Sequence, residues 1–373
     1  MTSKTAIRVC CALGTGLLIA ALMFACGDDG PTKSNQPEYF DGLPLSRVAW
    51  QYSSRPVPVN ESTQRGRILW HLPYDRPTRA DVYGPAVEQP QGVVQSLRLI
   101  YRPSFTVFGF GSDLDTLFYP SWAGIMFETD LPRDNSRTAA MYPTFLEIRL
   151  RASGGRMHID MGRINEDING DNQESGEDHG PDGNHNWVVD QEEDVGLDGL
   201  ADVDEPGYDP LTNPDPHRDN WYFRNEGKCP YPAAVCEDPV FQTRMEDPDD
   251  PIYYEWLNGT EGNREDPTRL GRPDDERLLG HFDTDDHYYT CLIDFDSNPD
   301  SFLVRGSEYY DWRTYRIPIG PGNTLADQLP TVGNNANWER FTHARIWFES
   351  GVDADGFDTV EIVDCSFVQP DAP

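Results

Sequence analysis

Oxygen-bearing side chains recur at short spacings between residues 182 and 204, and this pattern has the clearest potential for chemistry. The stretch DGNHNWVVDQEE supplies side-chain oxygens at positions 1, 3, 5, 9 and 12 of a twelve-residue loop, which are Asp182, Asn184, Asn186, Asp190 and Glu193. Those are ligand positions of a calcium loop, and the Val188 carbonyl falls at position 7. The string GLDGLADVDE then adds Asp198, Asp202 and Asp204. Hard oxygen ligands at such spacings favour Ca²⁺ over zinc, so the sequence predicts a structural calcium ion.

The loop departs from an EF-hand in two respects. Trp187 stands where an EF-hand loop needs glycine for its sharp turn, and no helical pattern flanks the segment. The competing interpretation is an acidic loop that is only solvated.

These residues lie in the first of two acidic regions. Residues 160–205 contain sixteen Asp and Glu and one basic residue, and residues 237–300 contain nineteen acids and five Arg. The whole chain has a formal net charge of −34, which argues against nucleic acid as a partner because phosphates would be repelled. Divalent cations, basic partners or solubility are the remaining interpretations. We expect long acidic loop insertions at about 160–222 and 230–285, and loops of this length are usually functional.

Catalytic patterns are weak by comparison. The chain has no G-x-S-x-G elbow, no H-E-x-x-H and no phosphate-binding glycine loop. A carboxylate pair for glycoside hydrolysis cannot be chosen among 64 acids without geometry. Aromatic residues such as Trp221, Tyr253, Tyr254 and Trp256 could stack on sugar rings, although a place in the core is the simpler interpretation. We therefore predict that the chain is not an enzyme.

Alternating apolar and polar residues predict the elements that position these loops. Leu146, Ile148 and Leu150 alternate with charged residues, and Met157, Ile159 and Met161 alternate with His158 and Asp160. Such a period of two is typical of half-buried strands with the polar face toward water. The expected strands are 47–52, 97–101, 122–129, 146–151, 157–161, 288–295, 309–317, 344–349 and 360–368. No amphipathic helix of twelve residues is evident, so we predict an all-β fold, a jelly-roll-like β-sandwich with long acidic loops.

The N-terminus reads as an export signal. Lys4 and Arg8 precede an uncharged run from Val9 to Ala25, which ends in small residues before Cys26. LMFAC resembles a bacterial lipobox, so residues 1–25 are interpreted as a signal peptide and Cys26 as the lipidated residue. The alternative is an uncleaved membrane helix. Residues 26–45 are expected to be a tether and residues 46–373 the sandwich, in an outer-membrane lipoprotein that faces the periplasm or the surface.

Four cysteines remain after the signal and the lipidated residue. Cys291 lies on the apolar face of one expected strand and Cys365 on the apolar face of another, so both are predicted to face the core. In an oxidising compartment we predict two disulfides, Cys291–Cys365 between strands and Cys229–Cys236 within a loop. Buried free thiols are the alternative.

Seven strings of the chain together resemble the SprA family, the very large outer-membrane proteins of gliding motility and type IX secretion. They are SWAGIM (121–126), FLEIRL (145–150), MHIDMGRINEDIN (157–169), GLDGLADVDE (196–205), LNGTEGNR (257–264), DWRTYRIPI (311–319) and FTHARIWFE (341–349). The resemblance is to soluble β-rich segments of that family and spans roughly residues 46–368. It implies no pore, because the chain lacks a series of lipid-facing strands, and it brings no catalytic residues.

These observations predict a non-enzymatic envelope lipoprotein, a calcium-stabilised binding or structural accessory module linked to secretion or gliding. Its expected partners are the membrane, through the lipid anchor, and an envelope protein or a glycan. A carbohydrate-binding module or glycoside hydrolase is the alternative, and a subunit whose partner covers a sheet edge is a third interpretation.

Overall fold

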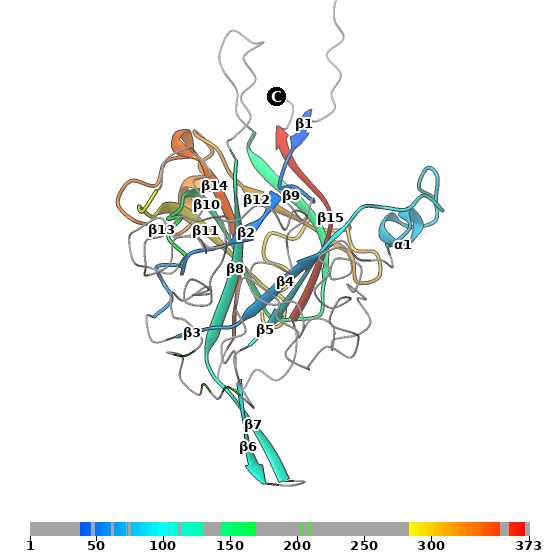
Figure 1. Ribbon diagram of the computed structural model, residues 1–373. Coiled ribbons are helices and arrows are strands. Elements are labelled where there is room, and N and C mark those ends of the chain that lie inside the picture. Colours follow the sequence, from blue (N-terminus) through cyan, green and yellow to red (C-terminus); the bar gives the residue numbers. More distant parts are fainter. Residues whose placement is uncertain are drawn as a thin grey trace, which may run out of the picture. The chain divides into compact units, whose positions relative to one another are not determined.

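The computed structural model describes most of the chain from residue 38 onward. The described residues are 38–45, 49–60, 63–71, 73, 76–103, 105–110, 113–129, 143–168, 203, 208, 210, 283–350 and 358–369. Two sheets dominate this part of the chain (Figure 1). All pairings between their strands are antiparallel except that of β3 with β8.

The first sheet has six strands in the order β12-β9-β15-β5-β4, with β1 paired to β15. Their bounds are β1 Glu38–Asp41, β4 Arg67–His71, β5 Leu97–Arg102, β9 Phe145–Ala152, β12 Arg313–Pro318 and β15 Asp358–Gln369.

The second sheet has seven strands in the order β13-β11-β10-β14-β8-β2, with β3 beside β8. Their bounds are β2 Gln51–Tyr52, β3 Gln64–Arg65, β8 Ser121–Glu128, β10 Arg156–Arg163, β11 His287–Asp294, β13 Thr331–Val332 and β14 His343–Ser350. A separate hairpin pairs β6 (Phe105–Phe110) with β7 (Asp113–Phe118). The helical pieces are short: α1 (Arg79–Tyr83), η4 (Ala326–Gln328) and η5 (Trp338–Arg340).

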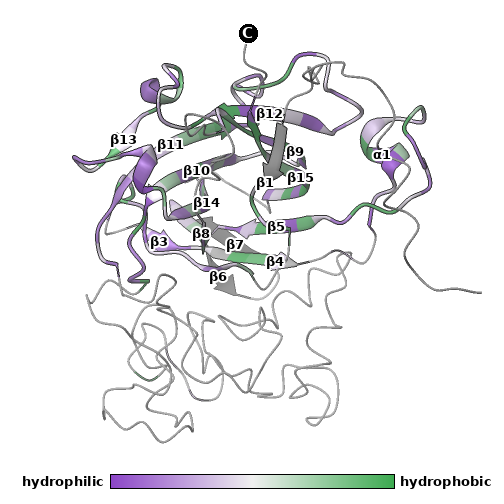
Figure 2. Ribbon diagram, turned by 90° about the horizontal axis from the view of Figure 1, so that it is seen from above, coloured by the Kyte–Doolittle hydropathy of each residue, from purple (hydrophilic) through white to green (hydrophobic). Residues whose placement is uncertain are grey.

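The core lies between the two sheets and follows the predicted alternation. Leu146, Ile148 and Leu150 of β9 share one buried cluster with Met157 and Ile159 of β10. Figure 2 shows the hydrophobic positions concentrated on the strands of both sheets. The prediction of an all-β sandwich is therefore confirmed, whereas the jelly-roll-like topology stays a prediction. Each of the nine expected strands contains or overlaps an observed one.

The predicted tether ends too late in the sequence. Residues Glu38–Asp41 form β1, which pairs with Ser366–Gln369 of β15, and Leu43 is buried in the core. The described part of the 26–45 segment thus belongs to the sandwich, and the boundary at residue 45 is wrong. The segment EYFD has no alternation that would mark it as a strand in the sequence. It is a strand because it pairs with β15.

The predicted Cys291–Cys365 disulfide is also wrong, although both residues face the core as expected. Cys291 lies on β11 of the second sheet and Cys365 on β15 of the first, and both thiols are free and buried. Packed sheets are separated by about 10 Å, whereas a disulfide needs Cα atoms about 4.4–6.8 Å apart. The Cys365 sulfur instead accepts the backbone N–H of Leu43 at 3.4 Å. Cys229 and Cys236 lie outside the described residues.

Candidate functional site

The two acidic regions belong largely to one connection between neighbouring strands. β10 and β11 pair along their whole length, with Arg163 opposite His287. Residues 164–286 therefore form a single insertion within a hairpin, which we call the acidic insertion. Both predicted loops fall in it, except that Asp160 and its neighbours up to Arg163 are strand residues.

Backbone pairing continues beyond the last residue pair of the two strands. Glu166 donates its backbone N–H to the Asp283 carbonyl at 2.7 Å. Asp283 returns a bond from its own backbone N–H to the Glu166 carboxylate, also at 2.7 Å. The two residues are fully or almost fully buried. The ends of the insertion, residues 164–168 and 283–286, are thus joined, and we call them the stem.

A buried ion pair lies on the outer face of the second sheet next to the stem. Asp160 and Arg345 are cross-strand partners on β10 and β14, and both are completely buried. One carboxylate oxygen, Asp160 Oδ2, accepts Arg345 Nε at 2.8 Å, Arg345 Nη2 at 2.6 Å and the Trp347 indole at 2.9 Å. Three donors on one oxygen fix the guanidinium and the indole together.

Further polar pairs tie the stem to the strands. His343 Nε2 lies 3.3 Å from Glu166 Oε1, and both side chains are completely buried. Arg163 contacts the Asp283 carboxylate and bonds Asp285 at 2.9 Å. Buried polar and charged groups are costly without partners, so each side chain of a pair fixes the position of the other.

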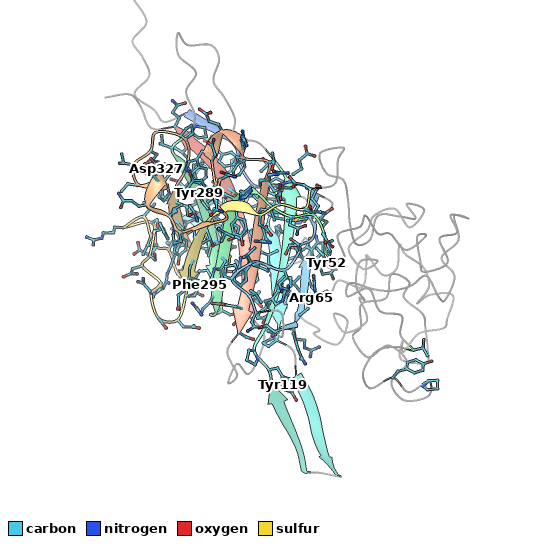
Figure 3. All side chains as sticks on the ribbon, turned by 90° about the vertical axis from the view of Figure 1, so that its left-hand side faces the viewer. Tyr52, Arg65, Tyr119, Tyr289, Phe295 and Asp327 are labelled. Carbon is cyan, nitrogen blue, oxygen red and sulfur yellow. The ribbon has the colours of Figure 1, made fainter. Side chains whose placement is uncertain are left out.

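A third segment, residues 53–57, crosses the same outer face and closes it. Arg345 Nη1 donates to the Ser54 carbonyl at 3.2 Å, and the Ser54 hydroxyl donates to the Asn165 carbonyl at 2.6 Å. Arg65 of β3 donates to the Ser53 and Ile168 carbonyls at 3.2 and 2.9 Å. Arg65 and Tyr52, from strands next to β8, are labelled in Figure 3.

Burial, charges and hydrogen bonds within this network shift the pKa values of several of its members. Burial raises the pKa of Asp286, against the lowering effect of Arg345. Burial alone would lower the pKa of Arg345, but Asp160, Tyr288 and Asp286 outweigh it and hold that pKa above the usual value. A hydrogen bond to Asp283 raises the pKa of Arg163. Both arginines therefore stay charged at every physiological pH.

The arrangement holds the two ends of the acidic insertion together. Within the described ranges, no group of three or more His, Cys, Asp and Glu is arranged to hold a metal ion. The ion pairs and backbone bonds fix the positions at which the acidic insertion leaves β10 and returns to β11. We therefore take the stem, with Asp160 and Arg345 beneath it, as the candidate functional site.

The residues predicted to bind calcium are not in this part of the structure. Asp182, Asn184, Asn186, Asp190, Glu193, Asp198, Asp202 and Asp204 all lie outside the described residues, as does Cys26. The calcium prediction and the lipidation prediction thus stay predictions.

Sequence reasoning missed Arg345, His343 and the burial of Asp160. Asp160 and Arg345 occupy polar positions of alternating strands, which predicts a solvated face. The prediction of a water-exposed polar face is wrong here, because segment 53–57 and the stem cover it. A single sequence contains no signal that distant loops meet over this face.

The chain matches no known protein-family model and no curated protein. Among the described residues, no helix is long and apolar enough to span a bilayer.

Proposed function

We propose that this chain is a non-enzymatic lipoprotein of the bacterial envelope whose β-sandwich carries a calcium-stabilised acidic insertion as a binding or structural accessory module. The observation that carries the proposal is the stem. Buried pairs His343–Glu166 and Asp160–Arg345 and the reciprocal Glu166–Asp283 bonds hold both ends of the insertion on the sheet. Binding residues are commonly found on loops that a rigid scaffold positions in this way.

The composition of the insertion supports a cationic ligand. Residues 169–282 contain 30 acidic and 8 basic residues, so they account for most of the net charge of the chain. Such like charges repel each other and oppose a compact arrangement. A calcium ion gathers six to eight oxygens at about 2.3–2.6 Å and neutralises part of this charge.

Thermal unfolding with calcium and with EGTA tests the proposal. Extracellular calcium modules bind at about 10⁻⁴–10⁻³ M, so the titration extends to millimolar calcium. We expect EGTA to lower the melting temperature and to expose protease sites between Asn165 and Asp219. Magnesium should rescue poorly, because it requires a smaller octahedral site.

Two variants locate the effect. Combined Asp198→Asn, Asp202→Asn and Asp204→Asn should remove the calcium response while the sandwich stays folded. Replacing residues 169–282 by a short Gly/Asn linker should give a protein that melts identically with calcium and EGTA. If the intact chain also melts and is cleaved identically in both conditions, the acidic residues are only a solvated surface.

The envelope location rests on Cys26 and on the resemblance to SprA segments, which supports a link to secretion or gliding. Cys26→Ser should give an unlipidated precursor that no longer incorporates radioactive palmitate. Unchanged labelling, or recovery of the native protein in the cytosol, would contradict the anchor. Pull-down of the intact lipoprotein from envelope fractions would identify its partner.

The alternative, a carbohydrate-binding module or glycoside hydrolase, needs exposed aromatic rings or a carboxylate pair in a groove. The six described tryptophans are all buried, and they are Trp50, Trp70, Trp122, Trp312, Trp338 and Trp347. These side chains therefore belong to the packing of the sandwich, which disfavours a tryptophan-based sugar site in the described part of the chain.

A further inference from the structure

An exposed tyrosine occupies a strained position in a tight turn on the other sheet. Tyr309 and Trp312 exchange two backbone hydrogen bonds of 3.0 Å, which leaves Tyr310 and Asp311 as the central residues of a hairpin turn before β12. Tyr310 has a φ of +49° and the residue is 83% exposed. Glycine or asparagine is the usual choice for such a backbone.

The contribution of Tyr310 to folding does not explain why a tyrosine occupies this position. A non-glycine residue held in the left-handed region is strained, and an exposed ring recovers little of that cost through burial. Strained positions of this kind are concentrated at binding sites. Contact with a ligand therefore explains the exposed position of this ring better than folding does.

The ring of Tyr310 has a fixed neighbour. Tyr309 lies with its ring centroid 4.7 Å away at an interplanar angle of 77°. The Tyr309 ring in turn packs on Gly84, the residue after α1, which has a φ of +93°. A Cβ at position 84 would lie 3.3 Å from the Tyr309 ring, so glycine allows this close approach.

The support beneath the two rings is also rigid. Val82 of α1 is fully buried in a cluster with Trp312 and Val363. Arg149 donates to the Val82 carbonyl, to the Ser307 carbonyl at 2.9 Å and to the Thr314 hydroxyl at 2.8 Å. The helix and the turn are therefore held together before any ligand binds.

Exposed carboxylates lie next to the tyrosine pair in the turn, which disfavours an anionic ligand. Glu308 and Asp311 flank the tyrosine pair in sequence and are exposed, and the charge of Asp81 acts on Tyr309. Carboxylates accept hydrogen bonds from hydroxyl groups and repel anions. The apolar face of a sugar ring can stack on an aromatic ring. A proline-rich peptide fits less well, because its grooves are lined by several aromatic residues, whereas here two rings stand nearly perpendicular.

We propose that Tyr310, with Tyr309 beside it and Glu308 and Asp311 next to the pair in the turn, binds an uncharged glycan by stacking one sugar ring on the Tyr310 face. This site lies at the first sheet, away from the stem in the fold. It does not depend on calcium, so its failure and the failure of the calcium proposal are separate results.

Affinity gel electrophoresis of the full mature chain tests the site, with hydroxyethylcellulose, xylan or galactomannan in the gel and alginate as an anionic comparison. We expect at least one neutral polysaccharide to retard the protein and alginate to have no effect. Tyr310→Asn should weaken the retardation at least tenfold in affinity. Leu325→Ala, which alters another exposed apolar residue that is 53% accessible, should leave it unchanged.

The melting temperature of Tyr310→Asn separates binding from folding. Asparagine tolerates a positive φ better than tyrosine, so the variant should melt at the same temperature or higher. A lower melting temperature would show that Tyr310 serves the fold and would overturn the proposal. So would the absence of retardation by all three neutral polysaccharides, equal retardation of Tyr310→Asn, or equal retardation by alginate.

Discussion

The Asp160 carboxylate and the Arg345 guanidinium form a two-bond ion pair, at 2.8 and 2.6 Å, with no exposed surface on either side chain. The pair joins β10 to β14 directly beneath the entry of the acidic insertion. Arg345 also reaches Ser54, so the same guanidinium holds the segment that covers it. The outer face of the second sheet therefore contains a buried cluster of polar side chains.

Arg345→Met should be strongly destabilising, because it leaves the Asp160 carboxylate buried without a counter-charge. Breaking one partner of a buried pair costs about 3–5 kcal/mol. Urea unfolding followed by circular dichroism measures the loss. The matched control is Arg305→Met, at an exposed arginine, which should change stability by no more than about 0.5 kcal/mol.

The double variant Asp160→Asn/Arg345→Met separates the ion pair from packing. Without the charge on residue 160, it should recover part of the loss seen with Arg345→Met alone. It also provides a folded protein if the single variant does not fold. An Arg345→Met protein as stable as the wild type would contradict the role of the pair.

Asp286→Asn should stabilise the protein at neutral pH. Burial raises the pKa of Asp286 above its value in the unfolded chain, so the ionised carboxylate opposes folding at pH values above the folded pKa. Asparagine keeps an oxygen for the Asn165 N–H, which lies 3.2 Å from Asp286 Oδ1, and removes the charge.

The pH dependence of this variant gives a test of sign. The stability gain should be largest above the folded pKa of Asp286 and should disappear as the pH falls toward the ordinary aspartate pKa of 3.8. Denaturation at a series of pH values measures it. A gain that grows on acidification would mean that the carboxylate is stabilised in the fold.

Cys291 and Cys365 should be unreactive thiols in the native protein. Burial raises the pKa of both, and the thiolate is the reactive form. Iodoacetamide should label neither residue in the folded protein and both in denaturant without any reductant, as read by peptide mass spectrometry. Recovery of a Cys291–Cys365 linked peptide would contradict the free thiols.

The inward faces of the strands could be predicted from the sequence, because alternation encodes them directly. Leu146, Ile148 and Leu150 face the core for the same reason that they alternate with charges. Sheet membership is a different kind of information. The alternation around Cys291 and Cys365 predicts correctly that both face the core, but it contains no information that they belong to opposite sheets.

The stem could not be predicted, for a related reason. Glu166 and Asp283 are separated by 117 positions and meet only because β10 and β11 are neighbours. Within acidic stretches they are indistinguishable from solvated residues. Their burial depends on Arg163, His343 and the crossing segment 53–57, each from a different part of the chain.

Arg149→Lys should loosen α1 from the first sheet while leaving the sandwich folded. The planar guanidinium of Arg149 serves Val82, Ser307 and Thr314 at once, and an ammonium group cannot reproduce this geometry. Leaving buried acceptors without donors costs about 1–3 kcal/mol. Hydrogen exchange should rise at α1 and at residues 307–314 and stay unchanged in β10 and β11. The matched control is Arg316→Lys: Arg316 donates two hydrogen bonds to a single Glu147 oxygen but is 42% exposed, so its replacement should cost at most about 1 kcal/mol. Equal exchange in the two variants would show that Arg149 does not anchor the helix.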